Sequence, residues 1–318
     1  MSDDPRLLRV ACVGVYIVDC LGRTIDDLPR GQVSRIIDEI RLTVAGTAGG
    51  TAVDLVRLGA NVLAVGAVGT DNLGKFLVSS LRDEGIQTKY LVRKKGVQTS
   101  ATILPISSTG ERPAWHVIGA NGMFDIADVP WSAIASCDHV HLGGISAMPM
   151  FDGEPSVNLL RFAKENGAVT SADCLGVKRA DMLSILEALL PYVDVFMPNR
   201  AEASAITGFA DPVEAAQRLY DLGAKTIMIT LGEQGCLVLD ESGYSHMRAF
   251  PGPVVDSTGC GDAFSAGVIV GLFMGWSSVE AARLGLAAAS LTLAGLGSDA
   301  GITSLSATML HMKTGAET

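Results

Sequence analysis

The sequence predicts an α/β fold: a doubly wound, mostly parallel sheet with helices on both faces, together with a small β-sheet lid. Short apolar runs of strand character alternate with helix-like runs along most of the chain, as in βαβ units. Two longer stretches break this alternation and carry extended runs without a helical pattern. A chain of 318 residues, 48% of them hydrophobic, can bury a large core, and we expect one domain over residues 1–318.

The main sheet is expected to form from apolar runs in chain order. The expected strands are 10–18, 62–68, 140–142, 169–173, 193–197 and 226–231. The expected helices are 51–57, 73–83, 156–166, 180–190, 201–207, 213–222, 261–275 and 278–294. The last two helices are rich in alanine and glycine, which permits close packing of their backbones.

The lid is expected from two insertions, at about 16–45 and 98–121. They carry the short extended runs 39–44, 100–105 and 115–118. Strands from two separated insertions can pair into a small sheet that covers the mouth of the main domain. The alternative is a long surface hairpin with no moving role.

Composition limits the partners. The net charge of −10, from 24 Lys and Arg against 34 Asp and Glu, argues against nucleic acid or an anionic membrane as partner, because both require a basic surface. No uninterrupted apolar run reaches about 18 residues, and the first residues lack the features of a signal peptide. The six cysteines show no Cys-x-x-Cys spacing, which favours reduced thiols in a cytoplasmic protein.

The segment Asp256-Ser-Thr-Gly-Cys-Gly-Asp262 runs directly into a helix of small residues. A helix start has unpaired N–H groups and the positive end of the dipole, so Gly259, Cys260 and Gly261 can direct amides at a transferring phosphate. Asp262 could cap the helix, or it could take a proton from an attacking hydroxyl in the same field.

This segment closely resembles the C-terminal signature Asp-Thr-x-Gly-Ala-Gly-Asp of the PfkB (ribokinase-like) carbohydrate kinases. Further matches occur in the family's order: Ala45-Gly46-Thr47-Ala48-Gly49-Gly50, Gly66 to Gly74, Asn199-Arg-Ala-Glu202, Thr230-Leu-Gly232-Glu-Gln-Gly235, and Gly14 followed five residues later by Asp19. These matches span nearly the whole chain. The resemblance implies an ATP-dependent kinase that transfers the γ-phosphate to a hydroxymethyl group of a sugar or sugar derivative. It also implies a lid that often forms the dimer interface, here in a homodimer.

The resemblance assigns roles to individual residues. Asp262 is the expected general base, and Gly259, Cys260 and Gly261 are the expected anion hole. The expected substrate-binding residues are Asp19, Gly46, Gly50 and Asn121. The residues expected to bind ATP are Asn199, Thr230, Gly232, Gly235 and Gly261. Glu202 and Asn199 are expected to hold Mg²⁺ directly or through water, and Asp256 and Thr258, with the loop 297–301, are candidates for K⁺.

Simpler interpretations stay open for several of these residues. Asn199 and Glu202 could be a helix-capping pair, Gly232 could only end a strand, and Asp19 could be a carboxylate of the lid hinge.

Two departures from the family pattern bear on the acceptor. Gly50 stands where the family commonly has an asparagine that meets sugar hydroxyls, and Ile17 replaces another asparagine of ribokinase-like chains. Both changes remove hydrogen-bonding groups and favour a less polar or bulkier acceptor, with Trp115, His116 and Asn121 as replacement contacts. A nucleoside kinase of the same fold and a non-catalytic sugar- or nucleotide-sensing protein are the alternatives. The low aromatic content of 5% weighs against a slot for a nucleobase.

Overall fold

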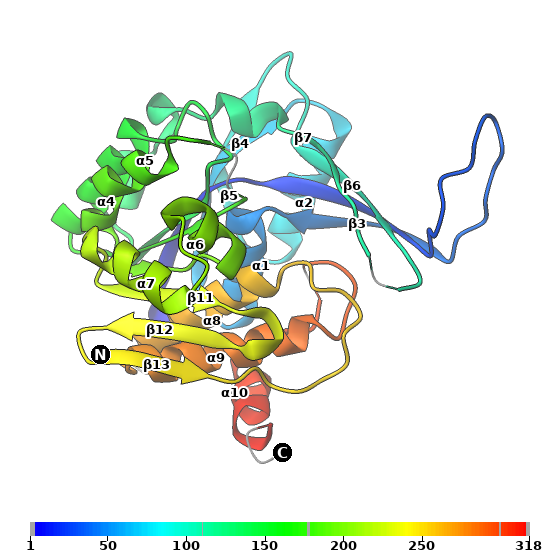
Figure 1. Ribbon diagram of the computed structural model, residues 1–318. Coiled ribbons are helices and arrows are strands. Elements are labelled where there is room, and N and C mark those ends of the chain that lie inside the picture. Colours follow the sequence, from blue (N-terminus) through cyan, green and yellow to red (C-terminus); the bar gives the residue numbers. More distant parts are fainter. Residues whose placement is uncertain (1–3, 110, 177–178, 299, 316–318) are drawn as a thin grey trace.

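The computed structural model describes residues 4–109, 111–176, 179–298 and 300–315. Its main sheet has nine strands in the order β13-β12-β11-β10-β9-β8-β1-β4-β5, parallel except for the β12 and β13 edge (Figure 1). The strands are β1 (Arg9–Gly14), β4 (Asn61–Gly69), β5 (Gln87–Lys94), β8 (His139–Ile145), β9 (Val169–Cys174), β10 (Val195–Phe196), β11 (Thr226–Thr230), β12 (Cys236–Asp240) and β13 (Gly243–Met247). The expected doubly wound, mostly parallel sheet is confirmed.

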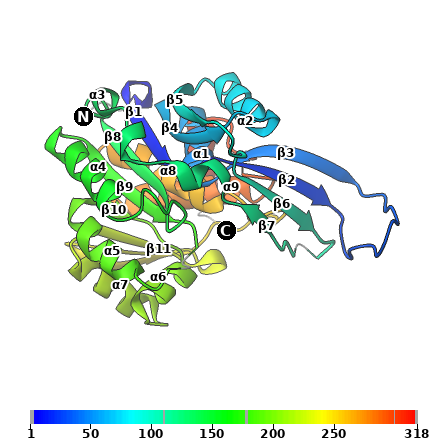
Figure 2. The same cartoon turned by 90° about the horizontal axis from the view of Figure 1, so that it is seen from above.

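Helices cover both faces of this sheet (Figure 2). On one face lie α1 (Thr47–Arg57), α2 (Asn72–Asp83), α8 (Cys260–Phe273), α9 (Ser278–Thr292) and α10 (Leu305–Thr314). On the other lie α3 (Trp131–Ile134), α4 (Glu154–Glu165), α5 (Met182–Leu189), α6 (Arg200–Thr207) and α7 (Pro212–Asp221). Short 3₁₀ turns occupy Pro5–Leu7, Gly119–Met123, Ile126–Asp128, Leu190–Tyr192 and Gly232–Gln234. Among the described residues, no helix is long and apolar enough to cross a membrane.

A second, smaller sheet stands apart from the first. It consists of β2 (Ile17–Arg23), β3 (Glu39–Ala45), β6 (Ala101–Ile106) and β7 (Trp115–Val117), in the order β3-β2-β6-β7. The link between β2 and β3 projects far from the body of the molecule (Figure 1). The expected pairing of strands from two separated insertions is therefore confirmed, and we call these four strands the second sheet.

Apolar side chains anchor the second sheet at one end. Leu21, Leu104 and Ile106 pack with Leu296 from the segment after α9. Two polar contacts join the same segments: Arg41 Nη1 donates to the Leu296 carbonyl at 2.8 Å, and Ser298 Oγ donates to the Val44 carbonyl at 2.5 Å. The second sheet is thus held over the carboxyl ends of the main strands.

The expected strand at 10–18 is wrong as a single element. β1 ends at Gly14 in the main sheet, and β2 begins at Ile17 in the second sheet. Gly14 has φ of +143°, and a Cβ there would lie 1.9 Å from the Gly143 carbonyl oxygen, so only glycine fits where the chain leaves the sheet. The apolar run continues across this break, which is why periodicity reads it as one strand.

Candidate active site

Two cavities lie on either side of the turn that precedes α8. The first, of about 480 Å³, is enclosed by the inner face of the second sheet and the segments that follow β8 and β9. The second, of about 720 Å³, is bordered by the β11–β12 turn, residues 249–254, α8 and α9. Ser257 lines both cavities. Ligands in the two cavities would therefore meet at this turn.

The first turn of α8 presents backbone N–H groups at this junction. The helix begins at Cys260 with Gly259 as N-cap, and no side chain caps it. Gly259 has φ of +81°, and a Cβ there would lie 2.4 Å from Ser298 Cα, so the close approach requires glycine. The interpretation of Asp262 as the cap is wrong, because Gly259 holds that position and Asp262 is the third residue of the helix.

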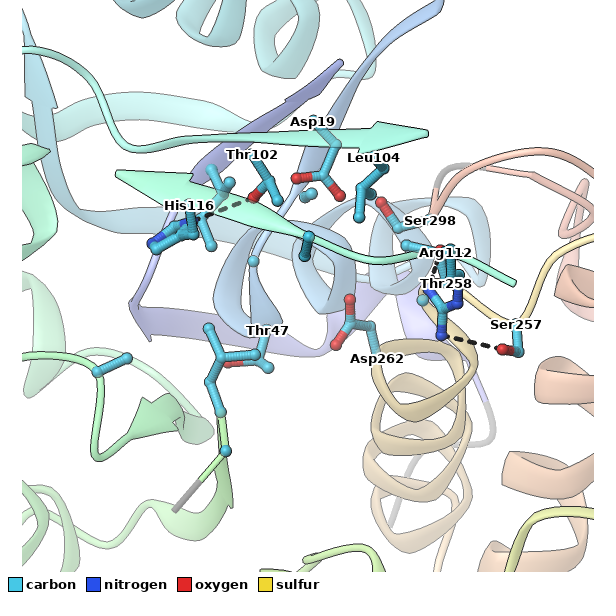
Figure 3. A pocket seen from close by; sticks show the side chains of 18 of the residues that line it. Asp19, Thr47, Thr102, Leu104, Arg112, His116, Ser257, Thr258, Asp262 and Ser298 are labelled. Atoms are coloured by element: carbon cyan, nitrogen blue, oxygen red, sulfur yellow. Dashed lines mark hydrogen bonds between the residues drawn. The ribbon is translucent and has the colours of Figure 1, made fainter. Parts of the chain in front are cut away.

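Asp262 borders the first cavity (Figure 3). Only 8% of the residue is exposed. Burial raises the pKa of the Asp262 carboxyl well above its usual value, and the Asp173, Asp54 and Asp19 carboxylates raise it further. A carboxylate with a raised pKa is a stronger proton acceptor than an exposed aspartate.

Gly50 lies directly beneath this carboxylate. A Cβ at residue 50 would be 2.1 Å from Asp262 Oδ2. Gly50 does not line the first cavity, and the approach of Asp262 leaves no room for a side chain at this position. Gly50 was expected to contact the substrate. The structure gives another reason for glycine at this position: a larger residue would collide with the Asp262 carboxylate.

The inner face of the second sheet carries a polar row. Asp19 on β2 pairs in register with Thr102 on β6, which pairs with His116 on β7. Asp19 is buried, and burial raises the pKa of its carboxyl to about 6, against the opposing effects of its hydrogen bond with Thr102 and the nearby Arg112. Thr102 Oγ1 and His116 Nδ1 lie 3.1 Å apart. All three face the first cavity (Figure 3).

Gly46 lines the same cavity, whereas Asn121 does not. Gly46 precedes α1 with φ of +85°. Asn121 is buried with both ends of its amide on the Tyr16 backbone: Oδ1 accepts from Tyr16 N at 3.3 Å, and Nδ2 donates to Tyr16 O at 3.1 Å. The structure thus assigns Asn121 to the connection between the two sheets, because its hydrogen bonds are used there.

The second cavity collects most of the residues expected to bind the nucleotide. Thr230, Gly232, Gly235 and Gly261 all line it. Gly235 requires glycine, since φ is +92° and a Cβ would lie 1.9 Å from the Met247 carbonyl oxygen. Asn199 does not line this cavity but forms a bridge with Thr230 at its border.

Asn199 and Glu202 form a capping box at the start of α6. Asn199 Oδ1 accepts from Glu202 N at 2.9 Å, and Glu202 Oε2 accepts from Asn199 N at 2.9 Å. Glu202 Oε1 accepts from Gly176 N at 3.0 Å. Burial raises the pKa of Glu202 to about 7, and the Asp173 carboxylate contributes. In the described part of the chain, no three His, Cys, Asp or Glu residues are grouped as metal ligands.

Asp256 ties the turn before α8 to the segment after α9. Its Oδ1 accepts from Thr258 N at 2.9 Å and Thr258 Oγ1 at 2.7 Å, and its Oδ2 accepts from Gly297 N at 3.0 Å. These contacts bring together the two segments expected to flank a K⁺ ion. Asp299, in the expected loop 297–301, lies outside the described residues.

Comparison with known proteins decides the family. The sequence profile of the pfkB family carbohydrate kinases matches residues 7–304. The chain belongs to this family. It is 27% identical over 299 residues to the ATP-dependent 6-phosphofructokinase of Thermoanaerobacterium thermosaccharolyticum, covering 91% of this chain and 89% of the relative. It is 28% identical to the ribokinase of Haemophilus influenzae, covering 82% and 85%.

Solved structures agree on the fold. A putative ribokinase II from E. coli, in complex with ATP and Mg²⁺, superposes with a TM-score of 0.82 at 21% identity, covering 97% of this chain and all of that one.

As a member of the pfkB family, the protein is an enzyme, a phosphotransferase with an alcohol group as acceptor. The alternative of a non-catalytic sensing protein is thereby set aside.

Two residues of the first cavity received no role in the sequence analysis of this pfkB-family kinase. Thr47 lies at the start of α1 in the first cavity, and its buried hydroxyl has no hydrogen-bond partner among the described residues. Arg112 follows β6 and reaches the turn before α8, where Nη2 donates to Ser257 Oγ at 2.9 Å and Nη1 donates to Thr258 Oγ1 (Figure 3). Neither residue type is distinctive in sequence, and both acquire a role only when distant segments meet.

Proposed function

We propose that this kinase transfers the γ-phosphate of ATP to a hydroxymethyl group of a sugar or sugar derivative, with Asp262 as general base. One observation carries the proposal: Asp262 and the amides of residues 259–261 lie at the junction of two cavities, one suited to an acceptor and one to a nucleotide. Phosphoryl transfer depends mainly on alignment and on stabilisation of charge, and this arrangement provides both.

In this scheme ATP lies in the second cavity with its γ-phosphate at the amides of Gly259, Cys260 and Gly261. The acceptor lies in the first cavity with its hydroxyl against Asp262. A bond forms between the hydroxyl oxygen and Pγ, and the bond from Pγ to the β,γ-bridging oxygen breaks with its electron pair leaving on ADP. The hydroxyl proton passes to the Asp262 carboxylate.

The acceptor cavity favours a sugar over a nucleoside. Among the described residues that line it, none is Phe, Tyr or Trp, so a base could stack only on the smaller His116 ring or on the Arg112 guanidinium. Asp19 and Thr47 supply acceptors for hydroxyl groups, while Ile17, Leu104 and Ile118 form an apolar wall. The names of the two relatives specify different sugars, so the sugar itself has to be found by experiment.

A screen of ADP release tests the proposal. Wild-type protein with ATP and Mg²⁺ would be offered sugars, sugar acids, sugar phosphates and nucleosides one at a time, with Asp262→Asn as the control for contaminating kinases. We expect turnover with at least one sugar-type acceptor and its loss in the control. Turnover confined to nucleosides, or none with any acceptor, would contradict the proposal.

Asn199 and Glu202 would hold Mg²⁺ through water. Their three side-chain oxygens already accept backbone N–H groups, and Mg²⁺ normally keeps several waters when it binds with phosphates. Burial is the main cause of the raised pKa of Glu202, and the nearby Asp173 carboxylate adds repulsion that a divalent cation would relieve. Bound with ATP, the ion neutralises charge on the phosphates.

Glu202→Gln should raise the Mg²⁺ concentration needed for the half-maximal rate, because the variant removes a negative charge near the ion. Glutamine keeps the capping-box acceptor for Asn199 N, but its amide nitrogen cannot accept from Gly176 N, so a modest fall in the thermal melting temperature should accompany the Mg²⁺ effect. An unchanged Mg²⁺ titration would leave Glu202 with its capping role alone.

A K⁺ ion beside Asp256 and Thr258 would help to order the phosphate-binding amides. Support comes from the contacts of Asp256 with both flanking segments. Exchange of K⁺ for tetramethylammonium at constant ionic strength should slow turnover, and an unchanged rate would remove this site.

We propose that the second sheet acts as a lid and forms the interface of a homodimer. Its outer face exposes an apolar set that one chain leaves uncovered: Ile40, Leu42, Ile103, Trp115 and Val117. Light scattering should give twice the 33.1 kDa chain mass, and Ile103→Lys should reduce it. A mass of 33.1 kDa for the wild type at micromolar concentration would reject the dimer.

The six cysteines all carry free thiols, which supports a cytoplasmic location. Cell fractionation would test it, and recovery of the protein from an oxidising compartment would contradict it.

A further inference from the structure

We propose that Arg112 is a catalytic residue that contacts the transferring phosphoryl group from the second sheet. Closure of that sheet would then also complete the anion-binding site. The inference rests on the proposed function, because it assigns Arg112 to the same phosphoryl transfer.

The position of Arg112 is fixed from both sides. On its own hairpin, Ser107 N donates to the Glu111 carbonyl at 2.9 Å, and Glu111 N donates to Ser107 Oγ at 2.9 Å, just before Arg112. At the other end, the guanidinium donates to the hydroxyls of Ser257 and Thr258. These contacts join segments about 145 residues apart in the chain, across the mouth of the acceptor cavity.

The positive charge of Arg112 suits the anionic phosphoryl group, which would be transferred at the turn between the two cavities. Of the described residues that line the acceptor cavity, it alone is Lys or Arg, whereas Asp19 and Asp262 are carboxylates. Its present partners are two neutral hydroxyls, with Asp256 Oδ1 at 3.7 Å from Nη1. Phosphoryl oxygens are stronger acceptors for a guanidinium fork, so they would replace the hydroxyls when ATP and acceptor meet at the turn.

A purely mechanical role is the competing explanation, and the chain offers a matched control for it. Arg41 also joins the second sheet to the body of the protein, through its 2.8 Å bond to the Leu296 carbonyl, but it does not line either cavity. If Arg112 only held the sheet closed, Arg112→Ala and Arg41→Ala should have similar effects. If Arg112 contacts the phosphoryl group, Arg112→Ala should lower kcat strongly, whereas Arg41→Ala should leave kcat near the wild-type value.

The experiment compares steady-state kinetics of wild type, Arg112→Ala, Arg112→Lys and Arg41→Ala with the best acceptor from the screen. We expect Arg112→Ala to lower kcat about 10²- to 10³-fold, as loss of one transition-state donor does, with the KM for ATP little changed. Arg112→Lys should recover only part of kcat, since it lacks the planar fork. Added guanidinium ion should partly rescue Arg112→Ala, and Arg41→Ala should keep kcat near the wild-type value.

Calorimetry gives a readout independent of turnover. Arg112→Ala should bind ADP with Mg²⁺ as the wild type does, but bind the ADP, Mg²⁺ and aluminium fluoride combination at least tenfold more weakly. The proposal is overturned if Arg112→Ala changes only the acceptor KM, if it matches Arg41→Ala, or if both proteins bind the fluoride combination equally. Absence of turnover in the wild type would instead count against the proposed function, and the calorimetric comparison would still judge Arg112.

Discussion

Asp262→Asn should lower kcat by about 10²- to 10⁴-fold while ATP affinity stays close to that of the wild type. The substitution keeps the size of the side chain at the start of α8 and removes only its capacity to take the proton. The amides of residues 259–261 remain, so nucleotide binding should persist. Steady-state kinetics with the best acceptor, together with calorimetric titration of a non-hydrolysable ATP analogue, would measure both effects.

The pH profile provides a second signature of the base. The carboxylate must be ionised to accept a proton, and burial with three neighbouring carboxylates raises the pKa of Asp262. In wild-type protein kcat/KM should therefore rise with pH, with its acid limb above the pH at which an exposed aspartate titrates. The residual activity of Asp262→Asn should lack this limb. Turnover equal to that of the wild type would leave Asp262 without a role as base.

Gly50→Ala should lower kcat about 10²-fold without removing any group that touches a ligand. The added carbon would lie 2.1 Å from Asp262 Oδ2, so the carboxylate has to move. A displacement of about 1 Å at a reacting group costs on that order in rate. Steady-state kinetics would measure the loss, and the thermal melting temperature would show whether the fold is retained.

Gly49→Ala is the matched control for this variant. Its added carbon would meet the Tyr16 and Val44 side chains at 3.3 Å, with no carboxylate near it. Both variants raise helix propensity in α1 by the same amount, so a difference between them reports on Asp262. If Gly50→Ala kept wild-type kcat, the packing of Gly50 against the base would have no catalytic consequence.

Local pattern predicted much of the fold. Apolar runs and helix-like runs predicted six of the parallel strands and eight helices, and the extended runs of two insertions predicted the second sheet. The β12–β13 hairpin, β5, α3 and α10 were not anticipated. The break between β1 and β2 at Gly14 could not be predicted from the sequence either, because its cause is a contact with Gly143, more than a hundred residues away.

The candidate site likewise contains some residues that the sequence could identify and others that it could not. The turn 256–262 and the glycines of the β11–β12 turn could be predicted because each lies in a short continuous motif that resembles a family signature. The contacts of Gly50, Asn121 and Arg112 could not be predicted, since what each one touches depends on distant segments: Asp262, Tyr16 and Ser257. The sequence analysis interpreted Gly50 as the loss of a substrate contact. In the structure, the Asp262 carboxylate occupies the space that a side chain at residue 50 would need.

A crystal structure with a non-hydrolysable ATP analogue, Mg²⁺ and the best acceptor tests the central claim most directly. The account predicts the γ-phosphate at the amides of residues 259–261 and the reacting hydroxyl oxygen within about 2.6–3.2 Å of the Asp262 carboxylate. A complex with the acceptor hydroxyl out of reach of Asp262, or with the phosphates away from that turn, would contradict it.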